Sequence, residues 1–433
     1  MTRYLGIDVG TTRTKALVYD AVSRRVLHAA STATPVERRA DGDRRRPDDV
    51  LDVTASVTRA VLDVVGGEDL GGVCVASVGE EVVLVDVSGA AVGSVPTWYA
   101  VDPAVTHDSP RHPEASRFKL ASLALRSPEA VASATSFTDL SGYVAARLVG
   151  AVGAGTAVMD RSHASRTDFY NAADREWDEE RYAGIPGIGA LGLPALADSG
   201  RAIGATAGDI ATAHGLPLGV PVVAGGHDHF CGAFGAGARE TGDVFISVGT
   251  SESQLVLVDE VPNGTLDAAL DIGTFVDGRH AYVHVAQSSG AAFAEALAAS
   301  GTEEDLDALY DALSRLDGPT DGAIVPGEAD LRPILDILQS QAAAAADITR
   351  RLMQACDTTA RRVLVGGAPV AQPLWRRIRA RTSPLPLTFL VESELSALGA
   401  ALLAQCAVEG AAPGPDRTTY PDDTSGPRGD PIV

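Results

Sequence analysis

The stretch that decides the fold of this chain is Val222–Ser251, which reads VVAGGHDHFCGAFGAGARETGDVFISVGTS. It predicts a buried strand ending in Gly225-Gly226, the triplet His227-Asp228-His229, a helix of small residues, and a second strand ending in Gly249-Thr250-Ser251. Open α/β sheets bind ligands at the carboxyl ends of strands, where a single acid can act as a general base. We therefore expect Asp228 to deprotonate a hydroxyl, and the glycine turn to hold an anion through its backbone N–H groups.

The size and charge of the chain restrict its class. Its 433 residues exceed one ordinary domain of about 100–200 residues, so we expect two domains. An apolar share of 45% with 21% charged residues is typical of a folded globular protein. The net charge of −22 argues against a nucleic acid or an anionic membrane as the main partner. An anionic substrate would therefore need local cations or a metal ion.

Cysteine usage and hydropathy favour a cytoplasmic location. The four cysteines are scattered, without CxxC pairing or the density of a disulfide framework. The first residues contain no charged segment followed by an apolar stretch, as a secretory signal would. No run reaches the roughly 18 apolar residues of a membrane span.

The first half predicts a mixed sheet with a helix on one face. Short apolar strands are followed by an amphipathic helix and a buried strand, and a further strand leads into the helix that begins at Asp228. These elements are expected at Tyr4–Val9, Thr14–Tyr19, Arg25–Ala30, Asp48–Val65, Val73–Val78, Val220–Gly225 and Asp228–Ala238.

An internal repeat predicts two similarly folded halves. Residues 7–20, IDVGTTRTKALVYD, align with residues 246–259, ISVGTSESQLVLVD. The simplest explanation is that each half opens with a hairpin whose glycine turn faces a common cleft, the alternative being a chance likeness of two hairpins. We expect domains at 1–240 and 241–410, and a disordered tail at 411–433, where Pro, Gly and Asp dominate.

The first glycine turn carries the residues of a phosphate and metal site. Asp8 ends the first strand, Gly10, Thr11 and Thr12 form the turn, and Lys15 follows. The carboxylate could hold Mg²⁺ through waters, while turn amides, hydroxyls and the lysine meet phosphate oxygens. The alternative is an ordinary hairpin turn. The second copy has Ser247 and Gln254 in place of the acid and the lysine, so the halves would share one nucleotide unequally.

Three further patterns leave alternatives open. Gly366-Gly367-Ala368 ends a strand, which suits either an adenosine pocket or a tight strand-to-helix turn. Neither a GxxxxGK[ST] loop nor a GxGxxG fingerprint in the required context is present. His227 and His229 flank Asp228 without a third ligand motif, which disfavours a transition metal. We expect His229 to hydrogen-bond a substrate hydroxyl or to be structural.

Six ordered motifs resemble the FGGY family of carbohydrate kinases, within the actin, Hsp70 and sugar-kinase fold group. The second stands where the family has TDxSNAS...W, the third surrounds the catalytic aspartate, and the first and fourth are phosphate motifs. They are YLGIDVGTTRTKALVYD (4–20), DRSHASRTDFYNAADREWDEE (160–180), GGHDHFCGAFGAG (225–237), DVFISVGTS (243–251), VLVGGAPVAQPLW (363–375) and ESELSALGAALLA (392–404).

The resemblance implies two ribonuclease H-like (actin-like ATPase) α/β domains, each a mixed five-stranded sheet with flanking helices, around a central cleft. It implies phosphorylation of a sugar or polyol hydroxyl by ATP, with Asp228 as the base and Asp8 near Mg²⁺. Glu80 and Trp98 fall on substrate positions, although a solvated hairpin and core packing are their alternatives. The implied ATP and phosphate positions are Gly10, Thr11, Thr12, Lys15, Gly249, Thr250, Ser251, Gly366, Gly367 and Ala368.

Two departures from the family pattern bear on binding. Trp98 is not followed by the usual Asp-x-Arg, and the chain is shortened between Gly318 and Gln341, near the expected nucleotide. Two other functions stay open: a non-catalytic ATP-binding sensor, and a kinase for a non-carbohydrate acceptor. We expect a small sugar or polyol as the partner, no nucleic acid, no membrane, and leave a homodimer open.

Overall fold

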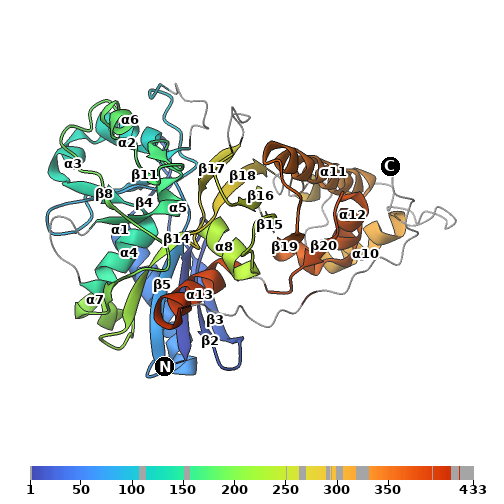
Figure 1. Ribbon diagram of the computed structural model, residues 1–433, viewed down its shortest axis with the longest axis horizontal. Coiled ribbons are helices and arrows are strands. Elements are labelled where there is room, and N and C mark those ends of the chain that lie inside the picture. The colour runs from blue at the N-terminus through green and yellow to red at the C-terminus, as the bar shows by residue number, and fades with distance from the viewer. Residues whose placement is uncertain are drawn as a thin grey trace. The chain divides into compact units, whose positions relative to one another are not determined.

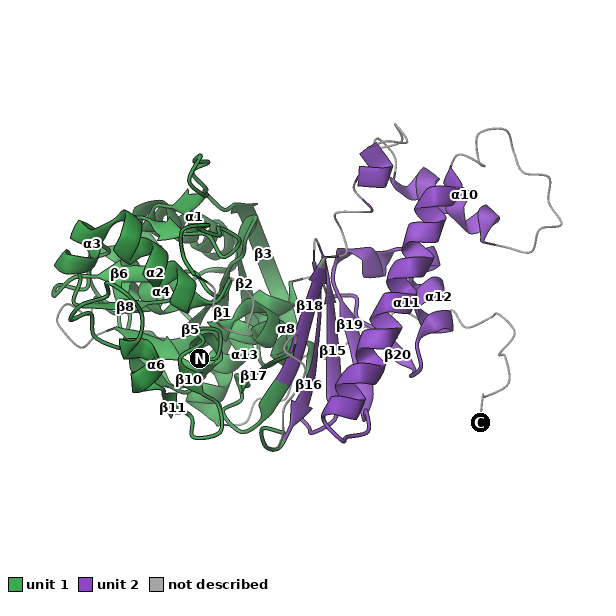
Figure 2. Ribbon diagram, turned by 90° about the horizontal axis from the view of Figure 1, so that it is seen from above, with its two compact units in different colours: residues 1–239, 259–282, 394–416 green, residues 240–258, 283–393, 417–433 purple. Residues whose placement is uncertain are grey.

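Two compact units make up the structure, a computed structural model (Figure 2). It describes residues 2–106, 114–150, 157–249, 251–262, 270–288, 293, 295–298, 306–317, 331–392, 394–410 and 419. Unit 1 comprises Met1–Arg239, Asp259–Tyr282 and Glu394–Asp416, and unit 2 comprises Glu240–Val258, Val283–Ser393 and Arg417–Val433. Apart from residue 419, the predicted tail lies outside the described residues, as do residues 318–330. The domain boundaries and the cleft predicted from the sequence stay predictions.

The sheet of unit 1 has the order β13-β14-β5-β1-β2-β3. Figure 1 labels its strands β14, β5, β2 and β3. Its central strands β1, β5 and β14 are parallel, while β2, β3 and β13 are antiparallel to their neighbours. The strands are β1 (Arg3–Val9), β2 (Arg13–Asp20), β3 (Arg25–Ala33), β5 (Leu70–Ser77), β13 (Ala202–Ala205) and β14 (Pro221–His227).

The strands of unit 2 repeat this order. They run β18-β16-β15-β19-β20, so the opening hairpin β15–β16 corresponds to β1–β2, and β19 pairs in parallel with β15 as β5 does with β1. The predicted internal repeat is thereby confirmed. Each large sheet contains six strands, one more than the five we expected; in unit 1 the extra strand is β13. The bounds in unit 2 are β15 (Asp243–Val248), β16 (Ser251–Val258), β18 (Ala281–Ser288), β19 (Arg362–Gly366) and β20 (Leu387–Phe389).

The two faces of β1 pack on different helices. Leu5, Ile7 and Val9 belong to a core cluster with residues of α1 (Pro47–Val65) and α4 (Leu140–Val149). Side chains alternate along a strand, so Gly6 faces the other way. A Cβ on Gly6 would lie 1.9 Å from the carbonyl oxygen of Ala397, in α13 (Leu395–Glu409). Asp8, two residues further on, therefore projects from the face that α13 covers.

Helix α13 also crosses α8 (Asp228–Ala236) at close range, and both belong to unit 1. A Cβ on Gly399 would lie 1.8 Å from the carbonyl oxygen of Cys231, and one on Gly235 would lie 2.1 Å from that of Leu395. The glycines let the two backbones touch. The carboxyl-terminal helix is thus held against the helix that carries Asp228.

The remaining elements of the described residues are short segments of unit 1 and helices of unit 2. In unit 1 these are β4 (Arg44–Arg45), β6 (Val83–Val85), β7 (Val95–Pro96), α2 (Ser116–Arg126), α3 (Pro128–Ser133), β8 (Ser136–Thr138), β9 (Val158–Asp160), α5 (Arg161–Ala164), β10 (Tyr170–Asn171), β11 (Glu176–Trp177), α6 (Glu179–Ala183), β12 (Ala195–Ala197), α7 (Gly208–Ala213) and β17 (Asp271–Thr274). In unit 2 they are α10 (Leu306–Leu316), α11 (Arg332–Ala355), η2 (Ala368–Ala371) and α12 (Pro373–Thr382). Among the described helices, none has the length and apolar character needed to cross a bilayer.

We predict that Gly399→Ala destabilises the protein. The added methyl group would collide with the Cys231 backbone, which cannot move aside like a side chain, and overpacking of this kind costs about 1–3 kcal/mol. The thermal midpoint should fall by several degrees in a calorimetric scan. Val408→Ala, which truncates an exposed side chain on the same helix, is the control and should leave the midpoint nearly unchanged. Equal midpoints for both variants would contradict the close crossing.

Candidate active site

The register of three parallel strands brings two aspartates to one edge of the sheet. Asp8 on β1 is opposite Ala76 on β5, which is opposite Gly226 on β14. His227 ends β14 one row further on, and Asp228 begins α8. The carboxyl ends of parallel strands form the usual ligand-binding edge of such sheets. Both candidate acids therefore lie where a ligand is expected.

Asp228 is held by its neighbours through one oxygen. Nδ1 of His227 lies 2.8 Å from Oδ1 of Asp228, and the backbone N–H of His229 donates to the same oxygen at 2.7 Å. The described residues offer no hydrogen bond to Oδ2. Burial alone would raise the pKa of Asp228, but His229, His227 and these hydrogen bonds hold it below its ordinary value. An ionised carboxylate with one oxygen open is suited to accept a hydroxyl proton.

His229 stands beside this carboxylate. Its ring stacks on that of His227, with centroids 5.4 Å apart and the planes inclined by 25°. Burial lowers its pKa, although Asp228 opposes that shift, so the ring is neutral at neutral pH. A neutral imidazole can both donate and accept a hydrogen bond. The role of His229 toward a substrate hydroxyl stays a prediction.

Asp8 has the opposite electrostatic character. Its side chain is buried, and Oδ1 accepts no hydrogen bond from the described residues. Burial and, next, the charge of Asp228 raise its pKa to about 8, against the effect of Lys15. Lys15 on β2 is opposite Asp8, and its Nζ lies 2.7 Å from Oε2 of Glu394, just before α13. The lysine predicted to bind phosphate thus carries a carboxylate partner here.

The surroundings of Asp8 fit a divalent cation. A buried carboxylate oxygen without a donor, beside a second carboxylate, is a place where a positive ion would lower the free energy. Carboxylate oxygens are also the ligands that Mg²⁺ prefers in proteins. Asp8 is therefore the residue that would hold the ion, directly or through water.

Two amides of the first glycine turn have no hydrogen-bond acceptor among the described residues. The carbonyls of Gly10, Thr11 and Thr12 accept hydrogen bonds from Thr34 Oγ1, Arg45 Nη2 and Thr34 N. Within residues 2–106, the backbone N–H groups of Thr11 and Thr12 make no hydrogen bond. Free amides on a tight turn are the groups that bind phosphate oxygens. The structure thus fixes the turn through its carbonyls.

Glu80, one of the predicted substrate residues, is buried and ion-paired. It has a φ of 61°, a conformation that a residue with a side chain rarely adopts. Its Oε1 lies 2.5 Å from Nη2 of Arg166, whose Nη1 lies 2.5 Å from Oδ2 of Asp271. Although burial opposes it, the two acids raise the pKa of Arg166 well above its ordinary value. The alternative of a solvated hairpin for Glu80 is wrong, because these contacts bury the side chain.

Trp98 contacts the first glycine turn. Its indole Nε1 donates to Oγ1 of Thr11 at 3.0 Å, and its backbone N–H donates to Oε1 of Glu81 at 3.3 Å. The side chain is half-buried and packs against the core cluster that includes α1. Its predicted role as a wall of the sugar site stays a prediction.

In unit 2 the second glycine turn and the paired glycines come together. Ser247 on β15 is opposite Gly366 at the end of β19. Gly367 has a φ of 120°, and a Cβ there would lie 1.9 Å from the carbonyl oxygen of Val248. Gly249 donates to the carbonyl of Ser251 at 2.9 Å, while Thr250 lies outside the described residues. The close backbone approach explains Gly367 structurally, and Ala368 begins η2 directly beside it.

Comparison with known proteins identifies the family. The sequence model of the FGGY family of carbohydrate kinases, N-terminal domain, matches residues 3–107 and 105–235, more than half of the chain. The chain belongs to the FGGY family. Its solved relatives share the fold: over 96% of this chain and 93% of the other, it superimposes on xylulose kinase from Rhodospirillum rubrum with a TM-score of 0.79 at 20% identity.

Curated relatives of the chain are named as kinases. The chain is 25% identical to L-fuculokinase of Salmonella typhi over 60% of its length, and 24% identical to gluconokinase of Bacillus licheniformis over 60%. These alignments span 58% and 53% of the two relatives, so the chain spans little more than half of their length. Fold similarity at 20% identity shows the fold alone.

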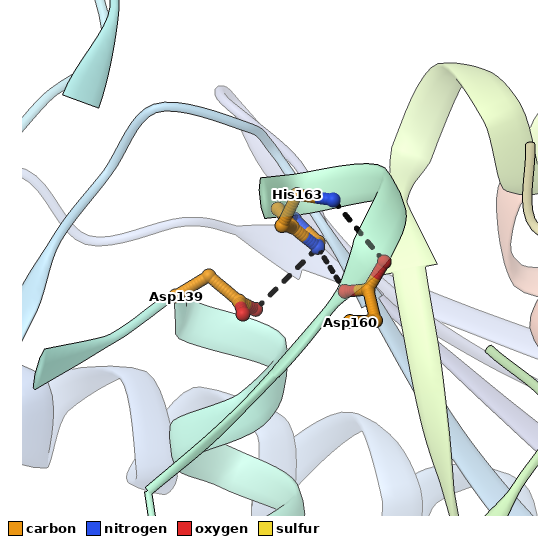
Figure 3. A group of neighbouring side chains, drawn as sticks. All are labelled: Asp139, Asp160 and His163. Atoms are coloured by element: carbon orange, nitrogen blue, oxygen red, sulfur yellow. Dashed lines mark hydrogen bonds and ion pairs between the residues drawn. The ribbon is translucent and has the colours of Figure 1, made fainter. Parts of the chain in front are cut away.

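The site contains residues that sequence reasoning left unassigned. Arg166 pairs with both Glu80 and Asp271, across long sequence separations. The sequence suggests His227 only as a possible metal ligand, yet its Nδ1 lies 2.8 Å from Oδ1 of the candidate base Asp228. The DRSHAS segment of the FGGY motif did offer a signal, because His163 stands where the quoted family pattern has Asn. Figure 3 draws the cluster Asp139, Asp160 and His163, whose imidazole stacks on that of His227.

We predict that Asp8→Asn stabilises the cation-free protein at alkaline pH. Asp8 ionises near its ordinary value when unfolded and near pH 8 when folded, so its contribution to stability is lost as pH rises through about 8. Asparagine removes this loss. With EDTA present, the thermal midpoint of the variant should exceed that of wild type by about 2 °C or more at about pH 9.5, and by less at about pH 6.

Two further measurements complete that test. Mg²⁺ should raise the midpoint of wild type more than that of Asp8→Asn, because a ligand stabilises the state that binds it. Asp209→Asn, an exposed substitution in the first turn of α7, is the control. A difference between Asp8→Asn and wild type that is constant with pH would show that Asp8 ionises normally in the folded protein.

Proposed function

We propose that this chain transfers the γ-phosphate of ATP to a hydroxyl group of a sugar or polyol, with Asp228 as the general base. The observation that carries the proposal is the carboxylate of Asp228, at the carboxyl edge of the sheet, with Oδ1 fixed by two donors and Oδ2 open. Membership of a family of carbohydrate kinases supports the reaction class.

The proposed reaction is a phosphoryl transfer from ATP to the acceptor hydroxyl. The acceptor hydroxyl lies against Oδ2 of Asp228 and gives up its proton to the carboxylate as its oxygen bonds to the γ-phosphorus. The bond between that phosphorus and the bridging oxygen breaks, and ADP leaves. Because the lowered pKa makes Asp228 a weak base, its main work is to orient the hydroxyl, and the proton moves late. Positioning and electrostatic stabilisation supply most of the rate in such reactions.

The phosphate groups of ATP are assigned to the glycine turns. The open amides of Thr11 and Thr12 support binding of phosphate oxygens in unit 1. For unit 2 we assign the same role to Gly249, Thr250 and Ser251, and the nucleoside to Gly366, Gly367 and Ala368. Mg²⁺ held near Asp8 would neutralise charge on the phosphate oxygens.

The acceptor side favours an uncharged polyhydroxylated molecule. The guanidinium of Arg166 forms ion pairs with Glu80 and Asp271, so its positive charge is already balanced by protein carboxylates. His229 is neutral, and Glu80 would repel a carboxylate on the acceptor. Hydroxyl groups can bind to such a mixture of acids and imidazole without a charge of their own. We assign Glu80, Trp98 and His229 to acceptor binding.

A substrate screen tests the reaction. ADP formation is measured with pentoses, hexoses, ketoses, tetritols and pentitols, with gluconate included as a sugar acid. We expect turnover with an uncharged member and little with gluconate. If nucleotide binds but no alcohol stimulates hydrolysis, a non-catalytic ATP sensor is favoured instead. If only carboxylates protect the protein against heat, a kinase for a non-carbohydrate acceptor is favoured.

We predict that Asp228→Asn strongly reduces transfer while nucleotide binding is retained. The amide keeps the size of the side chain but cannot accept the hydroxyl proton, and loss of a general base costs about 10²–10⁴ in rate. Steady-state kcat and calorimetric titration with ADP are the measurements. Asp209→Asn should have wild-type values of both. Undiminished turnover in Asp228→Asn would show that another group acts as the base.

A further inference from the structure

Three imidazole rings are stacked behind the carboxylate of Asp228. The ring of His163 lies 5.6 Å from that of His227, with the planes inclined by 30°, and His227 in turn stacks on His229 at 5.4 Å. The side chains of His163 and His227 are almost entirely buried. His163 therefore packs on the residue that contacts the base, and the described residues show no hydrogen bond or ion pair between His163 and Asp228.

Two carboxylates fix the position of His163 (Figure 3). Nδ1 of His163 lies 2.5 Å from Oδ2 of Asp160 and 3.6 Å from Oδ1 of Asp139. Asp160 is fixed in turn, because its Oδ1 accepts the backbone N–H groups at the start of α5, including that of His163. On the other side of the ring, Nε2 lies 3.2 Å from Oγ of Ser77. The imidazole is held at both nitrogens.

The electrostatics agree with this geometry. Burial alone would lower the pKa of His163, but Asp139 and Asp160 raise it to about 10, so the ring is an imidazolium at neutral pH. The acids therefore face a cation that belongs to the chain itself. The ligand atoms of these three residues lie within 4.8 Å of one another, a spacing that would also suit a metal ion. In this structure the N–H of His163 occupies the space between the carboxylates.

His227 is enclosed on several sides. Its backbone N–H donates to Oγ of Ser162 at 2.9 Å, which ties β14 to the start of α5. A Cβ on Gly79 would lie 2.4 Å from Cδ2 and Nε2 of the His227 ring, so the glycine makes room for the imidazole. His163 supplies the stacked surface on one face of the ring, and Phe230 packs nearby with its centroid at 4.7 Å.

We propose that His163 is a positioning residue for phosphoryl transfer: anchored by Asp139 and Asp160, it holds the ring of His227 so that Nδ1 stays on Oδ1 of Asp228. The hydrogen bond from His227 then keeps that oxygen occupied and presents Oδ2 to the acceptor hydroxyl. The inference rests on the proposed function, because it assigns work to residues behind the proposed base. It adds His163, Asp139 and Asp160, none of which is among the site residues predicted from the sequence.

A double-mutant cycle on kcat tests the proposal. His163→Asn removes the ring but keeps a polar side chain beside Asp160, and His227→Ala removes the residue through which His163 would act. We expect each single variant to lower kcat by about tenfold to hundredfold, as a small displacement of a reacting group does. The KM for ATP should stay close to that of wild type. In the His227→Ala background, His163→Asn should have little further effect, because the two residues act as one unit.

Controls separate positioning from folding. His214→Asn removes another buried histidine of unit 1, which bonds to Oγ1 of Thr54 and to the carbonyl of Ile210, and should lower the thermal midpoint while kcat is kept. If His163→Asn does not fold, Asp139→Asn is the milder variant. It retains an acceptor for Ser141 and Gly142 while removing a charge that faces His163, and it should lower kcat in the same direction.

A measurement independent of turnover distinguishes the two proposals. In protein with ¹⁵N-labelled histidine, the Nδ1–H signal of His227 should be lost or displaced in both Asp228→Asn and His163→Asn. If wild type shows no kinase activity but the Nδ1–H signal of His227 still changes in both variants, the kinase proposal is refuted while the contact between His163 and His227 stands. Three results would overturn the role of His163. The first is wild-type kcat in His163→Asn, and the second is an equal loss of kcat when His163→Asn is added to the His227→Ala background. The third is one tightly bound metal ion per chain that is released in Asp139→Asn.

Discussion

The parallel pairing of β1, β5 and β14 is the constraint on which the site depends. It places Asp8, Ala76 and Gly226 in one row, and so brings residues more than 200 positions apart to one edge. Small residues make this pairing close: a Cβ on Gly225 would lie 1.6 Å from the carbonyl oxygen of Val75. The glycines before Asp228 thus allow β14 to pair closely with β5, and this pairing sets the position of the acid.

Two neighbouring carboxylates at this edge have opposite environments. Asp228 accepts hydrogen bonds and lies among imidazoles, which lower its pKa, whereas Asp8 is buried without a donor for Oδ1, which raises its pKa. Environments that shift the pKa values of two neighbouring acids in opposite directions suit the acids to different roles. This difference supports the proposed roles, in which Asp228 orients a hydroxyl and Asp8 would hold a cation.

Several charged side chains of unit 1 are balanced by partners that belong to other elements. Glu80 shares Arg166 with Asp271, His163 lies between Asp139 and Asp160, and Lys15 pairs with Glu394. A buried charge left without its partner is costly, so these pairs fix the segments that carry them. Glycines at the α8–α13 crossing in turn let α13 pack closely on the helix that carries Asp228.

The sequence by itself determined the strands, the doubled hairpin and the two aspartates at strand ends. These features are local: the apolar runs, the glycine turn after Asp8 and the GGHD segment can each be recognised within about ten residues, and parallel sheets place ligands at strand ends. The tertiary structure alone decided which side chains meet. The pairing of Glu80 with Arg166, the contact of Trp98 with Thr11 and the ring of His163 on His227 depend on packing across long separations. A hydrophobic pattern specifies which face of a strand is buried, but it carries no information on which distant polar group will satisfy a buried charge.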